Sequence, residues 1–369
     1  MTQRWLVLVL CGLVWVGCAR TQGGIRGDLS QPVSDDWSDG RAMVVLQRGI
    51  DSEDPTLRTA AFIAWFSSGD RSAEKVVLRA ANDPSPIVQR ALAKRFPERF
   101  STPLQSRAAP DPMALAWLAF AGQSVACSGQ AIQCHLIRAL QGDEPAQRQL
   151  LARIEDGDVP ADSGFFELLS MMKLEGLGRA LLTGVEFAEA EVRISMALAA
   201  FSNGEAGAEK TLTSLLDSAE DPADHFWAIE ALVRGRISHA MDWLKQGRKS
   251  SDHARALYFR VALASFGEEG LGVVLEAIKT GDRDTRAWAI ECLGLLPKDR
   301  PLPREMIAIL QGSARDETGR IRLVSARVIA DKFGLKYVPL VRLPMEAEPD
   351  PAILFIAGKS LEEGIKKGP

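Results

Sequence analysis

The sequence predicts an all-α protein, an α-solenoid built from about nine to ten helical hairpins, some of them degenerate. The main observation is an internal repeat. Residues 227–232, Trp-Ala-Ile-Glu-Ala-Leu, return 61 positions later as residues 288–293, Trp-Ala-Ile-Glu-Cys-Leu, and a third variant occupies residues 255–263 between them. A period of roughly 30 residues is typical of stacked helical hairpins. The composition agrees, because the chain has only 2 Tyr and is rich in Ala and Leu, which favour helices over strands.

Charge restricts the class of partner. The 369 residues include 46% hydrophobic and 25% charged side chains, which is ordinary for a folded chain. The 44 basic and 48 acidic residues give a net charge of −4. Since there is no positive surplus to neutralise phosphates, we expect no nucleic acid among its partners.

Residues 1–17 are predicted to be a secretory signal peptide. One basic residue, Arg4, precedes an apolar run over residues 5–16, and the small residue Gly17 follows it. A run of 12 residues is too short to span a bilayer comfortably, so the segment is interpreted as a targeting signal and not as part of the fold.

The residues around Cys18 carry a family resemblance. Val16-Gly17-Cys18 resembles the lipobox of bacterial lipoproteins, whose Cys is lipid-modified and becomes the mature N-terminus, although Trp15 stands where that pattern has Leu. Ala19 implies, by the same resemblance, the outer membrane. We therefore expect a lipid-anchored protein of the bacterial cell envelope that faces the periplasm. A secreted protein with an incidental Cys18 is the alternative.

Two further segments follow the signal peptide. Residues 18–39 are predicted to be a flexible tether, because this stretch is rich in Gly, Ser, Asp and Gln and lacks an apolar period. Residues 40–368 are predicted to form the α-solenoid. A bend is expected near residues 97–112, where prolines interrupt the period.

Helix starts are marked by Asp-Pro pairs. After a first short helix over residues 41–48, Asp54-Pro55 and Asp83-Pro84 each open a run with apolar residues at helical spacing. An Asp side chain caps the free amides of a first turn, and Pro fits that turn. At the other end of the chain, residues 351–361 are predicted to form a half-repeat cap with a polar outer face.

Each predicted first helix carries a polar marker residue after its leading apolar residue. Most markers follow one another at intervals of 30 to 36 residues: Arg58, Gln89, Arg193, His225, Arg255, Arg286 and Arg322. Four of them are expected to form an inter-repeat ladder, namely Arg193, Arg255, Arg286 and Arg322. Their expected partners are acidic residues of adjacent turns: Asp221, Asp252, Asp282 or Asp316. The repeated Trp227 and Trp288 are expected in the core.

These helices resemble a known repeat family. Residues 54–61, 191–198 and 320–329 look like the first helix of HEAT repeats, of the short subtype also found in phycobilisome-lyase-like proteins. The resemblance implies an armadillo-type α-solenoid over most of the chain, and it implies a scaffold or adaptor. A lyase that attaches bilin chromophores, which the subtype also suggests, fits poorly with export.

The alternative function is an envelope enzyme. Ser170-Met-Met-Lys173, Ser251-Asp252-His253 and Lys279-Thr-Gly281 occur in the order of the serine–lysine signature of penicillin-binding proteins. However, His253 stands where Asn is needed, and Lys279 follows a helical pattern where that family has a strand. This alternative is a serine acyl-transferase that uses Ser170, Lys173 and Lys279, or a hydrolase with an unrecognised site. The main hypothesis has no catalytic residue.

No metal or cofactor site is predicted. Four carboxylates match positions of a calcium loop, but Pro160 and Ala161 replace a ligand and the Gly of its sharp turn. The four are Asp156, Asp158, Asp162 and Glu167. Three histidines spaced by 14 residues have no carboxylate or Cys that accompanies all of them, so we expect them on the surface or in a groove: His225, His239 and His253.

Three cysteines lie beyond Cys18, and their state is left open. Cys127 and Cys134 could pair across a turn in an oxidising periplasm. If both lay on one helix they would be about 10 Å apart, too far for a disulfide. In that case they are, like Cys292, small buried apolar residues.

The sequence-based hypothesis is thus a lipid-anchored periplasmic scaffold that binds another cell-envelope protein. Variable residues between the repeated phrases are the candidate partner-binding surface: His239, Asp242 and Trp243. The membrane is an expected partner through the N-terminal lipid.

Overall fold

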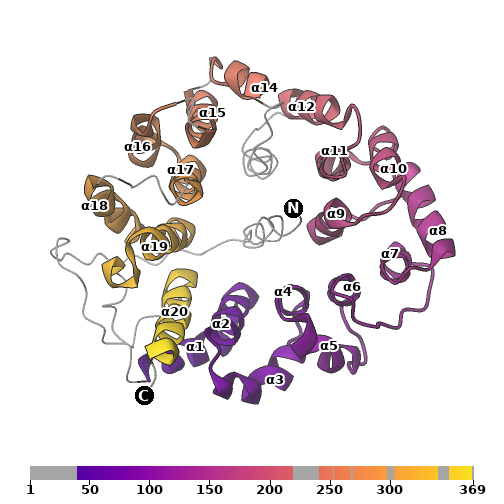
Figure 1. Cartoon of the computed structure of the whole chain (residues 1–369), viewed down its shortest axis with the longest axis horizontal. Coiled ribbons are helices and arrows are strands. Elements are labelled where there is room, and N and C mark those ends of the chain that lie inside the picture. The colour runs from indigo at the N-terminus through magenta and orange to yellow at the C-terminus, as the bar shows by residue number, and fades with distance from the viewer. Residues whose placement is uncertain are drawn as a thin grey trace. The chain divides into compact units, whose positions relative to one another are not determined.

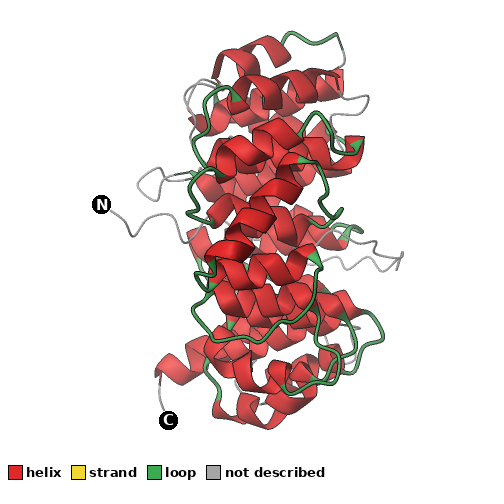
Figure 2. Cartoon of the chain, turned by 90° about the vertical axis from the view of Figure 1, so that its right-hand side faces the viewer, coloured by secondary structure: helices red, strands yellow, loops and turns green. Residues whose placement is uncertain are grey.

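The computed structural model describes residues 40–218, 241–251, 253–266, 269–296, 302, 304–339 and 349–367. These residues form an all-helical protein, and no strand occurs among them (Figure 2). The all-α class predicted from the sequence is confirmed. None of the helices in these ranges combines the length and the apolar character that a bilayer crossing requires.

The chain divides into two compact units. The described helices of the first unit (Figure 1) are α3 (Val77–Ala81), α4 (Pro86–Arg95), α5 (Pro97–Gln105), α6 (Pro112–Phe120), α7 (Ile132–Leu140), α8 (Glu144–Glu155), α9 (Ser163–Met171), α10 (Leu177–Gly184), α11 (Ala190–Ser202) and α12 (Ala208–Ser218). Those of the second unit are α1 (Arg41–Ile50), α2 (Pro55–Ser68), α14 (Met241–Gly247), α15 (His253–Phe266), α16 (Leu271–Thr280), α17 (Arg283–Leu295), α18 (Arg304–Ser313), α19 (Gly319–Phe333) and α20 (Pro351–Lys367). Two short 3₁₀ helices, η1 (Arg71–Val76) and η4 (Leu335–Tyr337), also lie in the second unit.

Helices of the first unit pack mainly on their neighbours in the chain, as α7 does on α8 and α10 on α11. Helix α4 also packs on α6, and α9 on α11. The helix α6 lies in the core, since all of residues 113–119 are buried. Residues 97–112, where a bend is predicted, form α5, which contains Pro103, and the connection to α6.

Asp residues cap several helices, but only one of the two predicted Asp-Pro starts is observed. The start predicted at Asp83-Pro84 is wrong, because α4 begins at Pro86 with Ser85 as its N-cap residue, and Asp83 instead accepts from the Ser85 amide at 2.9 Å. The side chain of Asp54 accepts a hydrogen bond from the Thr56 amide at the start of α2. Asp111 does the same for Ala114 in α6, with Pro112 in the first turn. These caps satisfy amides that have no partner inside the helix.

The second unit brings the two ends of the helical chain together. Helix α20 packs against α19 on one side and against α1 and α2 on the other. The approach is close: a Cβ atom at Gly49 of α1 would lie 2.6 Å from Leu354 Cδ2, and one at Gly358 of α20 would lie 2.8 Å from Ala64 Cβ. The predicted half-repeat cap with a polar outer face is therefore wrong. Residues 351–354 are all buried, and the N-terminal hairpin covers this helix.

Repeated phrases of the sequence pack on each other in the same unit. The Trp288 side chain of α17 is 2% exposed, and its ring stacks on Tyr258 of α15 with 5.3 Å between ring centroids. Trp288 therefore lies in the core, as expected. Trp227, its counterpart in the first phrase, lies outside the described residues.

Candidate functional site

A cluster of five charged side chains joins α4, α6 and α9 of the first unit. Arg90 of α4 donates from Nε to Asp111 Oδ2 at 2.8 Å and from Nη1 to Asp162 Oδ2 at 2.7 Å. Asp111 also caps α6, and Asp162 caps α9 by accepting from the Gly164 amide at 2.9 Å. One guanidinium therefore holds the N-terminal caps of two helices.

The second half of this cluster is an ion pair beside an aromatic ring. Lys94 Nζ, one turn after Arg90, donates to the carboxylate of Glu167 in α9. The same ammonium lies 4.8 Å from the ring centroid of Trp117, a core residue of α6 that is 4% exposed. Such a cation over an indole ring is favourable, most of all where water is excluded.

Burial changes the ionisation of two members of the cluster. Burial raises the pKa of Glu167, and the positive charge and hydrogen bond of Lys94 oppose that shift. Burial also acts to lower the pKa of Arg90, but hydrogen bonds and charge from Asp111 and Asp162 hold it above its ordinary value. Arg90 is thus a permanent cation between two carboxylates.

The residue types in this cluster indicate a structural role, in which ion pairs hold helices together. Its members are two cations and three carboxylates, each bonded to another member, and the set has no Ser, Cys or His to act as a nucleophile or proton shuttle. Separating one of these ion pairs would leave an uncompensated charge in a largely buried place, which is costly. The paired side chains therefore hold their helices in fixed positions. The cluster therefore fixes the relative placement of α4, α6 and α9.

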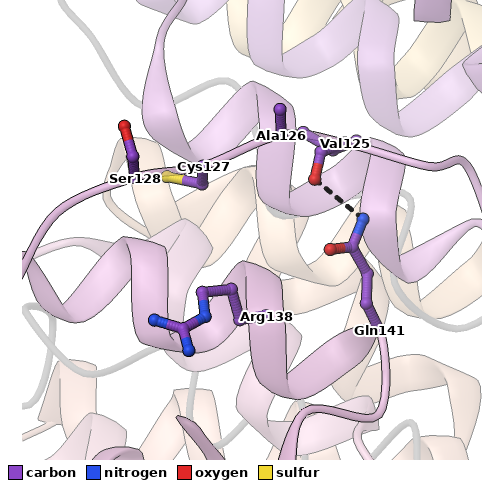
Figure 3. Close-up of a pocket in the computed structure, with 6 residues that line it drawn as sticks. All are labelled: Val125, Ala126, Cys127, Ser128, Arg138 and Gln141. Atoms are coloured by element: carbon purple, nitrogen blue, oxygen red, sulfur yellow. Dashed lines mark hydrogen bonds between the residues drawn. The ribbon is translucent and has the colours of Figure 1, made fainter.

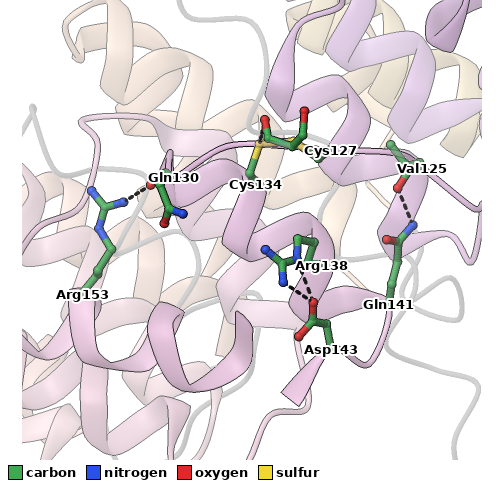
Figure 4. Close-up of a disulfide and its surroundings, with 9 residues drawn as sticks. Val125, Cys127, Gln130, Cys134, Arg138, Gln141, Asp143 and Arg153 are labelled. Carbon is green, nitrogen blue, oxygen red and sulfur yellow. Dashed lines mark hydrogen bonds and ion pairs between the residues drawn. A yellow bond between two sulfur atoms is a disulfide. The ribbon is translucent and has the colours of Figure 1, made fainter. Parts of the chain in front are cut away.

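A disulfide fastens the connection between α6 and α7 (Figure 4). Cys127 lies in this connection and Cys134 in the first turn of α7, and their Cα atoms are 5.5 Å apart. The pairing across a turn, one of the two outcomes left open by the sequence, is the one observed. Two further bonds hold the same segment: Gln141 Nε2 donates to Val125 O at 2.9 Å, and Arg153 Nη1 donates to Gln130 O at 2.8 Å.

An open pocket of about 400 Å³ lies beside this disulfide (Figure 3). Its lining is Val125, Ala126, Cys127, Ser128, Arg138 and Gln141. The guanidinium of Arg138 pairs with Asp143, the N-cap residue of α8. The pKa of Asp143 is lowered by the hydrogen bond that it accepts from the Ala146 amide and by Arg138. The pocket therefore places the half-buried Cys127 of a disulfide beside one cation.

The residues predicted to bind a partner lie outside the described part of the structure. His239 falls in the gap between α12 and α14, and the side chains of Asp242 and Trp243 at the start of α14 are likewise not described. The same holds for Cys18 and for residues 1–39 as a whole. The partner surface and the lipidation site stay predictions.

Several marker residues bond to the turn before their own helix. Arg58 Nη1 donates to the carbonyls of Ser52 and Glu53, and Arg193 Nε donates to the carbonyl of Ala188 at 2.9 Å. Gln89 and Arg322 also donate to such carbonyls, whereas Arg286 donates to the carbonyl of Ile278 in the last turn of the preceding helix, α16. A marker side chain therefore fastens the start of its helix to the preceding turn.

Two ladder residues of the second unit also contact a carboxylate farther along the chain. Arg286 Nη2 donates to Asp316 Oδ2, and Arg322 Nε donates to Asp350 Oδ2 at 2.8 Å. Asp350 caps α20, so this contact repeats the chemistry of Arg90 in the first unit. The side chain of Arg255 lies outside the described residues.

The serine and lysine residues of the enzyme alternative occupy helical positions. Ser170 Oγ, in α9, donates to the Glu167 carbonyl at 2.7 Å, and Lys173 is exposed just beyond this helix. Lys279 belongs to the other unit, where it is exposed in the last turn of helix α16. His253 is exposed at the start of α15.

Three of the four carboxylates that match a calcium loop pair with cations. Asp158 pairs with Arg153 at 2.6 Å, while Asp162 and Glu167 belong to the charged cluster. Within the described residues no group of His, Cys, Asp and Glu side chains is arranged to hold a metal ion. His225 lies outside the described ranges.

Sequence reasoning did not single out Arg90, Lys94 or Asp111. A signal for Asp111 was present, because Asp111-Pro112 has the same form as the other helix starts. The partners of Arg90 are harder to predict from the sequence, since Asp162 lies 72 positions away.

Comparison of the chain with protein-family models and with curated proteins finds no match.

Proposed function

We propose that this protein is an α-solenoid of HEAT-like hairpins that acts as a scaffold or adaptor for another protein of the bacterial cell envelope, to which it is anchored by a lipid on Cys18. The supporting observation is the recurrent contact between an Arg of one helix and the Asp that caps a later helix. It occurs at Arg90 with Asp111 and at Arg322 with Asp350. A repeated contact of this kind serves architecture, as in arrays whose units are stabilised by their neighbours.

The use of ionisable groups supports a binding role over a catalytic one. In the charged cluster of the first unit, each buried carboxylate caps a helix or pairs with a cation. The serine and lysine residues of the enzyme alternative are not bonded to one another: Ser170 Oγ donates to a backbone carbonyl, and Lys279 belongs to the other unit. Arrays of helices instead offer extended surfaces along which a partner protein can bind.

The Cys127–Cys134 disulfide supports a location outside the cytosol. Disulfides form and persist in oxidising compartments such as the bacterial periplasm. This support comes from residues 127 and 134, far from the predicted signal peptide. Two separate features of the chain thus favour export.

Cell fractionation tests the anchor. Wild-type protein is expected in the membrane fraction, and a Cys18→Ala variant is expected in the soluble periplasm, because the acyl chains would be absent. The anchoring proposal fails if wild type and variant are both recovered in the soluble fraction.

Site-specific photo-crosslinking in intact cells tests the adaptor role. A photoreactive residue at Asp242 or Trp243 is expected to give a discrete crosslinked species with one envelope protein. The matched control is the same residue at Arg148 of α8, whose side chain is 71% exposed and forms only a surface pair. The same products from all positions, or none from any, would contradict the proposed surface.

A further inference from the structure

We propose that the Cys127–Cys134 disulfide is a thiol-exchange site, at which an external thiolate attacks Cys127 Sγ through the adjoining pocket and Cys134 leaves. The inference concerns a pair of residues whose role is otherwise limited to fastening a loop. It does not depend on the proposed adaptor function.

Access selects Cys127 as the sulfur that is attacked. Cys127 lies in the non-helical connection before α7, is half-buried and lines the open pocket (Figure 3). Cys134 is buried, with 8% of its surface exposed, in the first turn of α7. Exchange rates depend on which sulfur a thiolate can reach, so the approach through the pocket ends at Cys127.

Electrostatics select Cys134 as the leaving group. It is the third residue of α7, in the first turn, where the positive end of the helix dipole stabilises a thiolate. Arg138, one turn later on the same helix, lines the pocket and adds positive charge, part of which Asp143 offsets. A thiol of lower pKa leaves faster in disulfide exchange. Access and leaving-group ability therefore favour the same direction of attack.

The exchange balances without another oxidant. The incoming thiolate forms a bond to Cys127 Sγ, the Cys127–Cys134 bond breaks, and its electron pair goes to Cys134, whose thiolate then takes a proton from water. The product is a mixed disulfide on Cys127. If the external thiol is a dithiol, its second sulfur attacks that mixed disulfide, releases Cys127 as a thiol and leaves the dithiol oxidised.

Exchange would loosen the connection between α6 and α7. The disulfide holds this segment together with hydrogen bonds that include those from Gln141 and Arg153 to its carbonyls (Figure 4). The remaining bonds are exposed or partly exposed, and such bonds contribute only about 0.5–1.5 kcal/mol each. The balance of thiols and disulfides in the compartment would thus determine how tightly this loop is held.

The test uses the full-length chain and reduced glutathione as the probe thiol. After timed incubation, free thiols are blocked by alkylation, and peptides are mapped by mass spectrometry. The expected product carries glutathione on Cys127 and the alkyl group on Cys134, while the buried Cys292 stays unmodified in the folded chain. Glutathione on Cys134, or no adduct on either residue, would overturn the proposal.

Two matched variants test the contribution of Arg138. Arg138→Gln is expected to slow formation of the Cys127 adduct by about two- to fivefold, since the leaving thiolate loses a neighbouring cation. Arg153→Gln removes a cation that fastens the same loop but does not line the pocket, and it is expected not to slow the reaction. Equal slowing in both variants would assign the effect to the loop and overturn the role of Arg138.

Discussion

Arg90 is the side chain on which the charged contacts of the first unit converge. Its side chain is 29% exposed, whereas the side chains of Asp111 and Asp162 are 7% and 17% exposed. Both carboxylates cap helices, so neither can turn to water without losing a cap. The cation therefore compensates two charges that are fixed in place.

Replacing Arg90 by Gln is expected to lower the free energy of unfolding by about 2–3 kcal/mol, less than for a fully buried pair because Arg90 is partly exposed. Urea denaturation provides the measurement. Arg148→Gln is the control, since its pair with Glu144 is exposed and long at 3.8 Å, and its loss should cost below about 0.5 kcal/mol. Equal losses in the two variants would contradict the role given to Arg90.

Glu167 links stability to pH. Burial raises its pKa, and Lys94 opposes the shift. A carboxyl group with a raised pKa binds its proton more tightly in the folded state, so its stabilising contribution is present below the ordinary glutamate pKa and is lost as the pH rises through the raised value. Across that window, wild type is expected to lose stability relative to Glu167→Gln. Denaturation curves measured over a pH series check this, and parallel pH profiles would disprove it.

At the scale of elements, glycines set how closely α20 packs on the N-terminal hairpin. Gly358→Ala is expected to destabilise the protein by about 1–3 kcal/mol, because the added methyl would lie 2.8 Å from Ala64 Cβ and 2.9 Å from Ala64 O. Gly272→Ala in α16 is the control: its added methyl meets nothing within 4 Å, and Ala favours a helix. Thermal unfolding distinguishes the two, and a Gly358→Ala variant as stable as wild type would refute the close approach.

The sequence predicts local features of the elements better than their partners. The Asp54-Pro55 pair identifies the cap of α2, because a cap and its amides are only two or three residues apart. Asp83-Pro84 has the same form, but α4 begins at Pro86 with Ser85 as its N-cap residue, so the pattern indicates the helix without its first residue. The pairing of Arg90 with Asp162 depends on how α4 and α9 pack, which no local pattern encodes. The disulfide stays open in the sequence for a similar reason, since it requires knowing that α7 begins after Cys127.

The C-terminal helix is the clearest case in which the sequence misleads. Charged residues near the end of the chain, such as Glu362 and Glu363, suggest a cap with a polar outer face. In the structure, Ala352, Leu354 and Ile356 are fully buried, because α20 has helices on two sides. The second neighbour is separated from it by nearly the whole chain, so periodicity along the sequence could not indicate it.

At the scale of the whole molecule, the second unit combines helices from residues 41–68 with helices from residues 241–367. Removal of residues 351–369 is expected to expose apolar surface of α2 and α19 and to destabilise this unit. Hydrogen exchange should then show loss of protection in α1, α2 and α19, while α7 and α10 of the first unit keep theirs. Uniform loss of protection in all of these helices would show that the units do not unfold separately.

Packing of α1 and α2 on α20 also sets an order of events during synthesis. Ala64 and Gly358, which touch in the folded protein, are 294 positions apart. The hairpin of α1 and α2 is synthesised early, but its apolar face is covered only after α20 has been made. Contacts between such distant segments form late and slow the completion of folding. The described helices of the first unit, α3 to α12, are contiguous in the chain, so their packing on one another does not depend on α20.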